Sequence, residues 1–343
     1  MFDILLSVCL LADPTACRLE RHAGGETRAA CAAKALRLSQ AVTDPERAER
    51  WPCVPEGTTP KLTLSEIAPG VLVHQGQHAD FDALNVGDIA NIGVVIGERS
   101  VAIIDAGGSA TVARRLLEAL PMVTPLPISH VILTHMHPDH SFGAATLAAD
   151  GATIVGHAKL PRAIAARRAH YTARAQEVLG AAFADTTLAD PDIAVEDRLE
   201  IDLGGRVLEL VAQPTAHSDN DLTVFDRQTG TLFVGDLLFL SHLPVVDGSV
   251  LGWLEVIDAL SALDAERAVP GHGPVSVPWP SAAAPMTRYL DVLVAEAREA
   301  IAAGIPIGDA AATIGHEAAA DWLLADHFAI RNALTVYKEL EWE

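Results

Sequence analysis

A run of seven residues, Thr134-His135-Met136-His137-Pro138-Asp139-His140, places three imidazoles and a carboxylate directly after an apolar segment at 131–133. The apolar segment predicts a buried strand. His135 and His137 are two residues apart, so an extended backbone directs both side chains to the same side. Pro138 then turns the chain so that Asp139 and His140 face the same centre. The run therefore predicts a metal site in which each pair holds one metal ion.

Three residues in the second half of the chain have the chemistry of further metal ligands. His217 and Asp236 each follow an apolar, strand-like segment, and the carboxylate of Asp236 is expected at the tip of its strand. His272 lies between two glycines, where the backbone turns freely and the imidazole can be aimed. Taken singly, Asp139 is equally explained as a helix cap and His272 as an ordinary loop residue. The ordered set as a whole favours metal binding.

The motif His-x-His-x-Asp-His, followed by a histidine, an aspartate and a histidine, resembles the metallo-beta-lactamase superfamily. The resemblance covers about residues 65–275 and implies an α+β fold, the four-layer αββα sandwich. It implies two metal sites bridged by Asp236, of which the first contains His135, His137 and His217 and the second Asp139, His140 and His272. It also implies that Asp105 orients the metal-binding loop and that a polar loop at 76–91 overhangs the site. The alternative for Asp105 is a simple turn residue, and the alternative for the loop is a surface hairpin.

The remaining sequence pattern agrees with a sandwich of sheets and helices. Strands are predicted at 72–75, 94–97 and 100–105, and helices at 111–120, 160–183 and 251–263. The last part of the chain is predicted to be mostly helical, with a break at 304–306. We expect a small cysteine-containing module at 1–60, a catalytic domain at 61–280 and a helical extension at 281–343 that packs on it.

All four cysteines, Cys9, Cys17, Cys31 and Cys53, lie in the N-terminal module, where residues 4–10 predict a strand. Their clustering predicts two disulfides with unknown pairing, and four buried reduced thiols are the alternative. Disulfides would place the protein in the periplasm. No export signal is recognisable, and its absence favours the cytoplasm.

A narrower resemblance covers nearly the whole chain. Segments 7–14, 247–254, 269–274 and 339–343 are similar to the SoxH-related quinoprotein relay system zinc metallohydrolases, type 2. That resemblance implies two zinc ions and a functional link to a quinoprotein dehydrogenase and cytochrome c, but no particular substrate. Iron and manganese stay open, because imidazole and carboxylate ligands suit several first-row metals.

Charge and hydropathy restrict the partners. The formal net charge is -21, from 45 acidic and 24 basic residues, and such a surface repels phosphate backbones. We therefore expect a small-molecule substrate and no nucleic acid. No apolar run approaches the roughly 18 to 20 residues that span a bilayer, so membrane insertion is not expected.

The predicted reaction is hydrolysis by a dinuclear zinc centre. Two ions about 3.5 to 4 Å apart can share a metal-bridging hydroxide, because each lowers the pKa of bound water. The hydroxide would attack an ester, lactone, thioester or amide bond, while Asp236 keeps the ions apart and Asp139 accepts a proton. The alternatives are an iron-dependent persulfide dioxygenase and a noncatalytic binding or maturation factor for a quinone cofactor.

His242 is a further candidate catalytic residue. It lies six residues after Asp236, on a loop expected to cross the mouth of the site. A neutral imidazole there is expected to donate a hydrogen bond to an oxyanion or to protonate a leaving group, without binding metal. The alternative is a surface or partly buried loop histidine.

Overall fold

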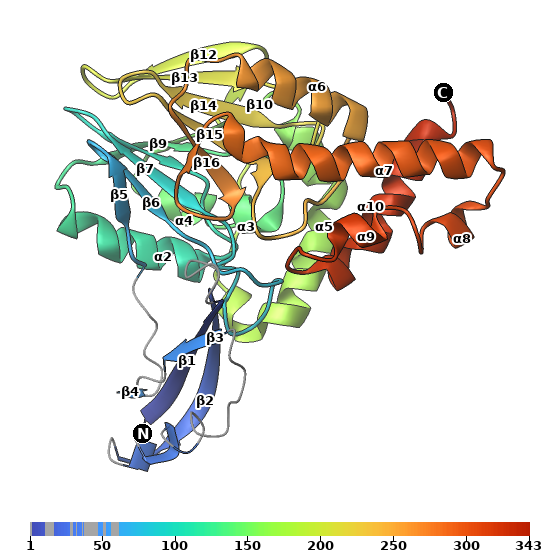
Figure 1. The fold of residues 1–343 in the computed structure, drawn as a ribbon. Coiled ribbons are helices and arrows are strands. Elements are labelled where there is room, and N and C mark those ends of the chain that lie inside the picture. Colours follow the sequence, from blue (N-terminus) through green and yellow to red (C-terminus); the bar gives the residue numbers. More distant parts are fainter. Residues whose placement is uncertain are drawn as a thin grey trace.

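The computed structural model describes residues 62–343 throughout and, before them, residues 2–10, 17–27, 30–31, 33–35, 37, 47–50 and 53–55. Near the N-terminus, β1 (Phe2–Leu10) pairs antiparallel with β2 (Cys17–Gly25), β3 (Arg47–Arg50) and β4 (Cys53–Pro55). This small sheet projects from the rest of the molecule (Figure 1). The strand predicted at 4–10 is confirmed as part of β1.

Cys31 is buried and disulfide-bonded. The side chains of Cys9, Cys17 and Cys53 lie outside the described residues. The arrangement of two disulfides therefore stays a prediction.

The first of the two large sheets has seven strands in the order β11-β10-β9-β8-β7-β6-β5. They are β5 (Ser65–Ala68), β6 (Val71–His74), β7 (Ile92–Ile96), β8 (Val101–Ile104), β9 (Ile128–Ile132), β10 (Thr153–His157) and β11 (Ile193–Val195). Strands β8 to β11 are mutually parallel, and β5 to β8 are joined antiparallel. The central strands β8 and β7 are covered on both faces, which explains their continuous apolar sequence.

The second large sheet has six strands in the order β12-β13-β14-β15-β16-β17. They are β12 (Arg198–Asp202), β13 (Val207–Ala212), β14 (Leu222–Asp226), β15 (Thr231–Phe239), β16 (Arg267–His272) and β17 (Val277–Pro278). Neighbouring strands are antiparallel except β15 and β16, which are parallel and are connected by a helix.

Alternation along β8 shows how the layers are built. Ala102 and Ile104 point into the apolar cluster between the two sheets, where they join Leu210 and Phe233 of the second sheet. Their neighbours on the strand point the other way, into a cluster under the helices α2 (Ala110–Ala119), α4 (Ala144–Leu147) and α5 (Leu160–Leu179). A third cluster joins β15 to the helices α6 (Val250–Ser261), α7 (Ala284–Ala302) and α10 (Ala325–Leu340). The predicted αββα sandwich is thereby confirmed (Figure 1).

The C-terminal helices pack on the sandwich. Trp253 of α6, Tyr289 of α7 and Val336 of α10 belong to one buried cluster with Leu238 of β15. The predicted break at 304–306 separates α7 from α8 (Ile307–Ala310), which is followed by α9 (His316–Ala319). The domain boundaries near residues 60 and 280 stay predictions. Among the described helices, none combines the length and apolar character needed to cross a bilayer.

Candidate metal centre

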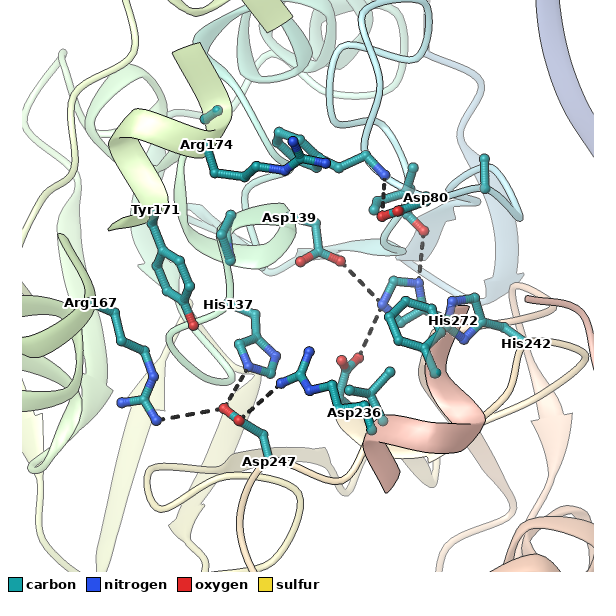
Figure 2. A pocket seen from close by; sticks show the side chains of 18 of the residues that line it. Asp80, His137, Asp139, Arg167, Tyr171, Arg174, Asp236, His242, Asp247 and His272 are labelled. Atoms are coloured by element: carbon teal, nitrogen blue, oxygen red, sulfur yellow. Dashed lines mark hydrogen bonds and ion pairs between the residues drawn. The ribbon is translucent and has the colours of Figure 1, made fainter. Parts of the chain in front are cut away.

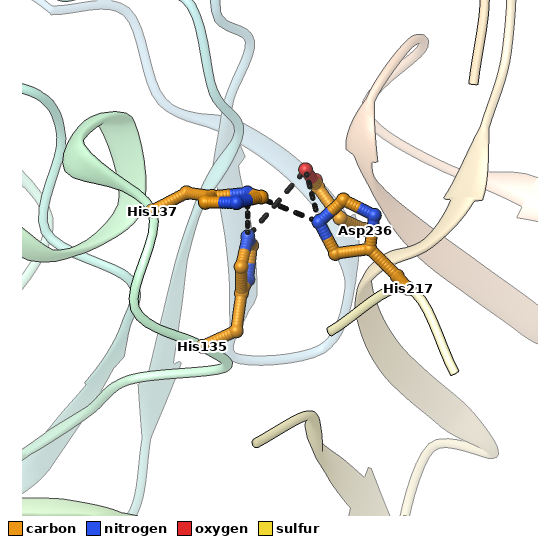
Figure 3. Close-up of side chains that lie close together, drawn as sticks. All are labelled: His135, His137, His217 and Asp236. Atoms are coloured by element: carbon orange, nitrogen blue, oxygen red, sulfur yellow. Dashed lines mark hydrogen bonds and ion pairs between the residues drawn. The ribbon is translucent and has the colours of Figure 1, made fainter. Parts of the chain in front are cut away.

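Seven side chains predicted as metal ligands converge at one edge of the two sheets and form two groups. The first group contains His135, His137, His217 and Asp236, and the second contains Asp139, His140 and His272. Within each group, the candidate ligand atoms all lie within 4.8 Å of one another. Figure 2 shows Asp139, Asp236 and His272 turned toward one another, and Figure 3 shows the first group.

The loop after β9 is held in place by Asp105, as the sequence predicts. One carboxylate oxygen of Asp105 accepts a hydrogen bond from the backbone N–H of Thr134 at 2.8 Å. The other accepts from Nδ1 of His140 at 2.7 Å. Asp105 itself has a φ of 62°, a left-handed conformation that aspartate tolerates better than most residues. This turn therefore orients two parts of the ligand-bearing segment, including the short helix α3 (Pro138–Ser141).

Each of the five histidines uses its outward ring nitrogen to bond an oxygen atom. Nδ1 of His135 lies 3.0 Å from the Thr134 hydroxyl, Nδ1 of His140 lies 2.7 Å from Asp105, Nδ1 of His217 lies 2.8 Å from the Val245 carbonyl, Nδ1 of His272 lies 2.9 Å from the Ile89 carbonyl, and Nε2 of His137 lies 3.1 Å from Asp247. A nitrogen that donates a proton outward leaves the other nitrogen with a free lone pair. In its neutral form each of the five rings would therefore present a lone pair to a cation.

The inward ring nitrogens lie close to one another and to a carboxylate. Nδ1 of His137 lies 3.0 Å from Nε2 of both His135 and His217. Nε2 of His140 and Oδ1 of Asp236 are buried and lack a hydrogen-bond partner, although they are 3.1 Å apart. Ring nitrogens and carboxylate oxygens this close in a buried space repel unless a cation, either a proton or a metal ion, lies between them. The residues present therefore fit a metal centre.

Asp236 faces both groups. Its Oδ2 lies 3.5 Å from Nε2 of His135 and of His217, while its Oδ1 lies 3.1 Å from Nε2 of His140 and 3.5 Å from Nε2 of His272. One oxygen is thus available to each group, which is the arrangement that a bridging ligand requires.

Burial and the neighbouring charges favour the metal-binding forms of His135, His217 and Asp139, whereas nearby carboxylates raise the pKa of His140 and His272. Burial lowers the pKa of His217 to about 3 and lowers that of His135 well below its usual value. Burial opposes ionisation of Asp139, but the neighbouring His140 and His272 outweigh it and lower the pKa to about 2. Burial also acts on His272, where the carboxylates of Asp236 and Asp139 prevail and raise the pKa to about 9. A metal ion would therefore displace a proton from His272.

The position of Asp236 differs from the prediction. Asp236 lies inside β15, which continues to Phe239, and not at the strand's tip. Gly235 has a φ of 52° and the pairing with β16 shifts at this point, so the strand bends there and continues. A side chain on Gly235 would lie 2.7 Å from Thr134. The apolar sequence up to Gly235 could not reveal that pairing resumes after the bend.

Gly271 gives Asp236 its space. A Cβ atom on Gly271 would lie 1.9 Å from Oδ1 of Asp236. Backbone freedom, the reason expected for the glycines around His272, agrees with the φ of 138° at Gly273. At Gly271 the reason is close packing against the bridging carboxylate.

The loop between β6 and β7 overhangs the centre, as the sequence predicts. Asp80, Phe81 and Ile89 from this loop line the pocket above the metal groups. The loop is anchored by a buried pair, His74 Nε2 to Asp88 Oδ1 at 2.7 Å. At its end, the side chain of Asn91 donates to the carbonyl of Pro270 at 2.9 Å and thereby joins the two sheets beside the site.

The pocket has a volume of about 460 Å³, and one of its walls was not predicted. Helix α5 contributes Arg167, Tyr171 and Arg174, and Arg331 comes from α10. The α5 residues are spaced four and three apart, so they share one helix face. Such a stripe was the available sequence signal, but a polar stripe on a helix normally faces water. The role of Asp247 was also not predicted. Its carboxylate accepts a hydrogen bond from His137 and is contacted by Arg167 and Arg331.

His242 lines the same pocket and is almost completely buried. Its ring stacks on that of His272, with centroids 5.1 Å apart. Burial, then the neighbouring His272, lowers its pKa to about 3, so the ring is neutral. Its Nδ1 donates to the carbonyl of Leu243 at 2.7 Å, which leaves Nε2 as a hydrogen-bond acceptor. The expected donor role therefore changes to an acceptor role, and contact with substrate stays a prediction.

Solved structures of known proteins share this fold. A metallo-beta-lactamase from Pontibacter korlensis is 19% identical, with a TM-score of 0.53, over 66% of this chain and 99% of that one. The stereoselective inverting sec-alkylsulfatase Pisa1 from Pseudomonas sp. is 18% identical, with a TM-score of 0.63, over 81% of this chain and 50% of that one.

Sequence comparison identifies the family. The 2,4-dinitroanisole O-demethylase subunit alpha of Nocardioides sp. (strain JS1661) is 26% identical over 179 residues, 51% of this chain. The chain spans 50% of that relative's length and 30% of another curated relative. The sequence model of the metallo-beta-lactamase superfamily matches residues 85–272, more than half of the chain and all of the candidate ligands. The chain therefore belongs to the metallo-beta-lactamase superfamily.

Proposed function

We propose that the protein is a dinuclear zinc-dependent hydrolase of a small molecule with an ester, lactone, thioester or amide bond. One observation carries this proposal: the carboxylate of Asp236 offers one oxygen to each of two groups whose imidazoles are already oriented for a cation. Two zinc ions, when bound, supply Lewis-acid activation of the substrate and a hydroxide nucleophile at neutral pH.

Side chains of the protein would position the metal ligands, accept a proton and limit the access of water. Asp236 fixes the separation of the two groups, and Asp105 and Asp247 hold the rings of His140 and His137 in one tautomer. Asp139 is ionised at neutral pH, since its pKa is about 2, and its carboxylate lines the pocket. It can accept the proton that the nucleophile loses. The loop that carries Phe81 and Ile89 limits access of bulk water.

The names of several similar proteins support hydrolysis, but they do not point to one common substrate. The similar proteins include a metallo-beta-lactamase, a sec-alkylsulfatase, an O-demethylase subunit and a putative diflavin flavoprotein. The intact set of ligand positions favours catalysis over a noncatalytic quinone-binding role. The link to a quinoprotein dehydrogenase and cytochrome c, and the choice of zinc over iron or manganese, stay predictions.

The test combines metal exchange with a substrate panel. The purified protein is stripped with a chelator, reloaded with zinc, iron or manganese, and assayed with ester, lactone, thioester and beta-lactam substrates. Oxygen uptake with a glutathione persulfide is measured in parallel. We expect hydrolysis with zinc and none after stripping. Oxygen consumption with iron, and no hydrolysis with zinc, would replace the proposal by a dioxygenase.

A further inference from the structure

We infer that the substrate carries a negatively charged oxygen group, and that Arg167, Tyr171 and Arg331 bind this group at one end of the pocket. The inference rests on the hydrolase proposed above and adds a substrate class to it.

The three side chains come together from two helices. Arg167 and Tyr171 are four residues apart on α5, so they lie on the same helix face, and Arg331 projects from α10. All three line the cavity that contains the metal groups. Figure 2 shows the guanidinium of Arg167 and the hydroxyl of Tyr171 on the side of the pocket where His137 and Asp247 lie.

One carboxylate is shared by two guanidinium groups. Nη2 of Arg331 lies 3.0 Å from Oδ1 of Asp247, and Nη2 of Arg167 lies 3.6 Å from its Oδ2. Oδ2 of Asp247 also accepts the hydrogen bond from His137. A single negative charge therefore faces two permanent positive charges, and this end of the pocket keeps a positive excess.

The excess is unusual for this chain. The protein has 45 acidic and 24 basic residues, so a pocket with the average composition of the chain would carry a negative charge. Two of the other carboxylates in the pocket, Asp139 and Asp236, belong to the metal groups, whose ions would neutralise them. A cationic end inside an anionic molecule focuses the field on one place and attracts an anionic ligand there.

Hydrogen-bond donors remain for such a ligand. A guanidinium has five N–H groups, and the contact between Arg167 and Asp247 is too long for a hydrogen bond. Burial, and then Asp247, raises the pKa of Tyr171, so its hydroxyl keeps its proton and can donate. Arg174, which lines the same pocket, differs because Glu177 pairs with it at 3.2 Å.

The rest of the cavity wall suits an apolar body. Phe81, Phe239, Val245 and Phe328 line it, and Phe328 packs on the ring of His242 with centroids 5.3 Å apart. The cavity of about 460 Å³ has room for a small molecule. The substrate class is therefore an amphiphilic anion, with an apolar or aromatic part and a carboxylate or sulfate group.

Calorimetry on the zinc-loaded protein tests the inference without turnover. The probes are 4-phenylbutyrate and its neutral counterpart 4-phenylbutyramide, with 3-phenylpropyl sulfate to distinguish a sulfate group from a carboxylate. We expect the preferred anion to bind at least about tenfold more tightly than the amide. Arg167→Gln and Arg331→Gln should each weaken anion binding about tenfold and leave amide binding within about twofold. Metal content is measured for every variant.

Two further variants complete the design. Arg162→Gln removes the same charge from an exposed position of α5 and should leave both affinities unchanged. Arg331→Lys keeps the charge and should restore part of the anion preference. Equal binding of amide and anions by the wild type, or an anion preference that survives both Gln substitutions, would overturn the inference. If the anion preference holds while the panel of esters is not hydrolysed, the hydrolase proposal fails and the binding site stands.

Discussion

The floor and the rim of the pocket are built in different ways. The metal floor, meaning the seven candidate ligands, comes from β15, β16, α3 and the loops between the two sheets, and His140 and His217 are completely buried. The pocket rim, meaning Arg167, Tyr171, Arg174, Asp247 and Arg331, comes mainly from helices α5 and α10, and its guanidinium groups are partly exposed. The floor side chains contact one another in a buried space, whereas the arginine side chains of the rim are 35 to 59% exposed. We infer that the floor sets the reaction and the rim selects the substrate.

The largest effect is expected from Gly271→Ala in the floor. The added Cβ would lie 1.9 Å from Oδ1 of Asp236, so the bridging carboxylate must move. We expect loss of one metal equivalent and a fall in turnover of about 100-fold or more. Gly308→Ala, where nothing lies within 4 Å, is the matched control and should behave as the wild type. Normal metal content in Gly271→Ala would contradict the packing explanation.

A smaller effect is expected from Asp105→Asn. Asparagine also tolerates the φ of 62°, so the substitution removes the charge beside His140 and preserves the backbone. We expect about 10- to 100-fold weaker binding of one of the two metal ions, measured by competition with a chelator. A chelator titration identical to that of the wild type would remove Asp105 from the support of the floor.

His242 lies between floor and rim. His242→Ala should leave metal content unchanged and reduce turnover by about tenfold, a barrier change of about 1.4 kcal/mol. The physical reason is loss of the acceptor Nε2 and of the ring that stacks on His272. Kinetics are measured on the best substrate of the panel. Lost metal would make His242 part of the floor, and unchanged kinetics would place it outside the mechanism.

The smallest effect concerns the loop above the floor. Burial lowers the pKa of His74, but Asp88 outweighs it and raises the pKa above 6.5. The protonated pair therefore stabilises the loop fully below pH 6.5, and this contribution is lost as the pH rises through the raised pKa. Hydrogen exchange of residues 76–91, corrected for intrinsic rates, should be about threefold faster at pH 9 than at pH 6. The control His74→Gln should show no such change, and equal rates in the wild type would contradict the pair's role.

The floor could be predicted from the sequence because its chemistry is concentrated in short segments. Five of the ligands lie in or beside turns that follow apolar strands, and a strand end fixes where the next side chains point. The layers of the αββα sandwich could also be predicted, because the alternation of strands and helices is a local sequence pattern. The bend at Gly235 was missed, because strand pairing after it depends on β16, more than thirty residues away.

The rim could not be predicted because its residues have no local signature. Arg167 and Tyr171 belong to a helix whose polar face looks like any surface face, and Arg331 is separated from them by more than 150 residues. Only the packing of α10 against the sandwich brings them together. Asp247 was missed because its role depends on the ring orientation of His137, which the sequence leaves open.

The number of metal ions per chain is the most direct test of the central claim. Native mass spectrometry of the zinc-loaded protein, compared with Asp236→Ala, measures it without any substrate. We predict two zinc ions in the wild type and at most one in the variant, because each oxygen of Asp236 faces one group. A single ion in the wild type that is retained unchanged by Asp236→Ala would contradict the dinuclear centre.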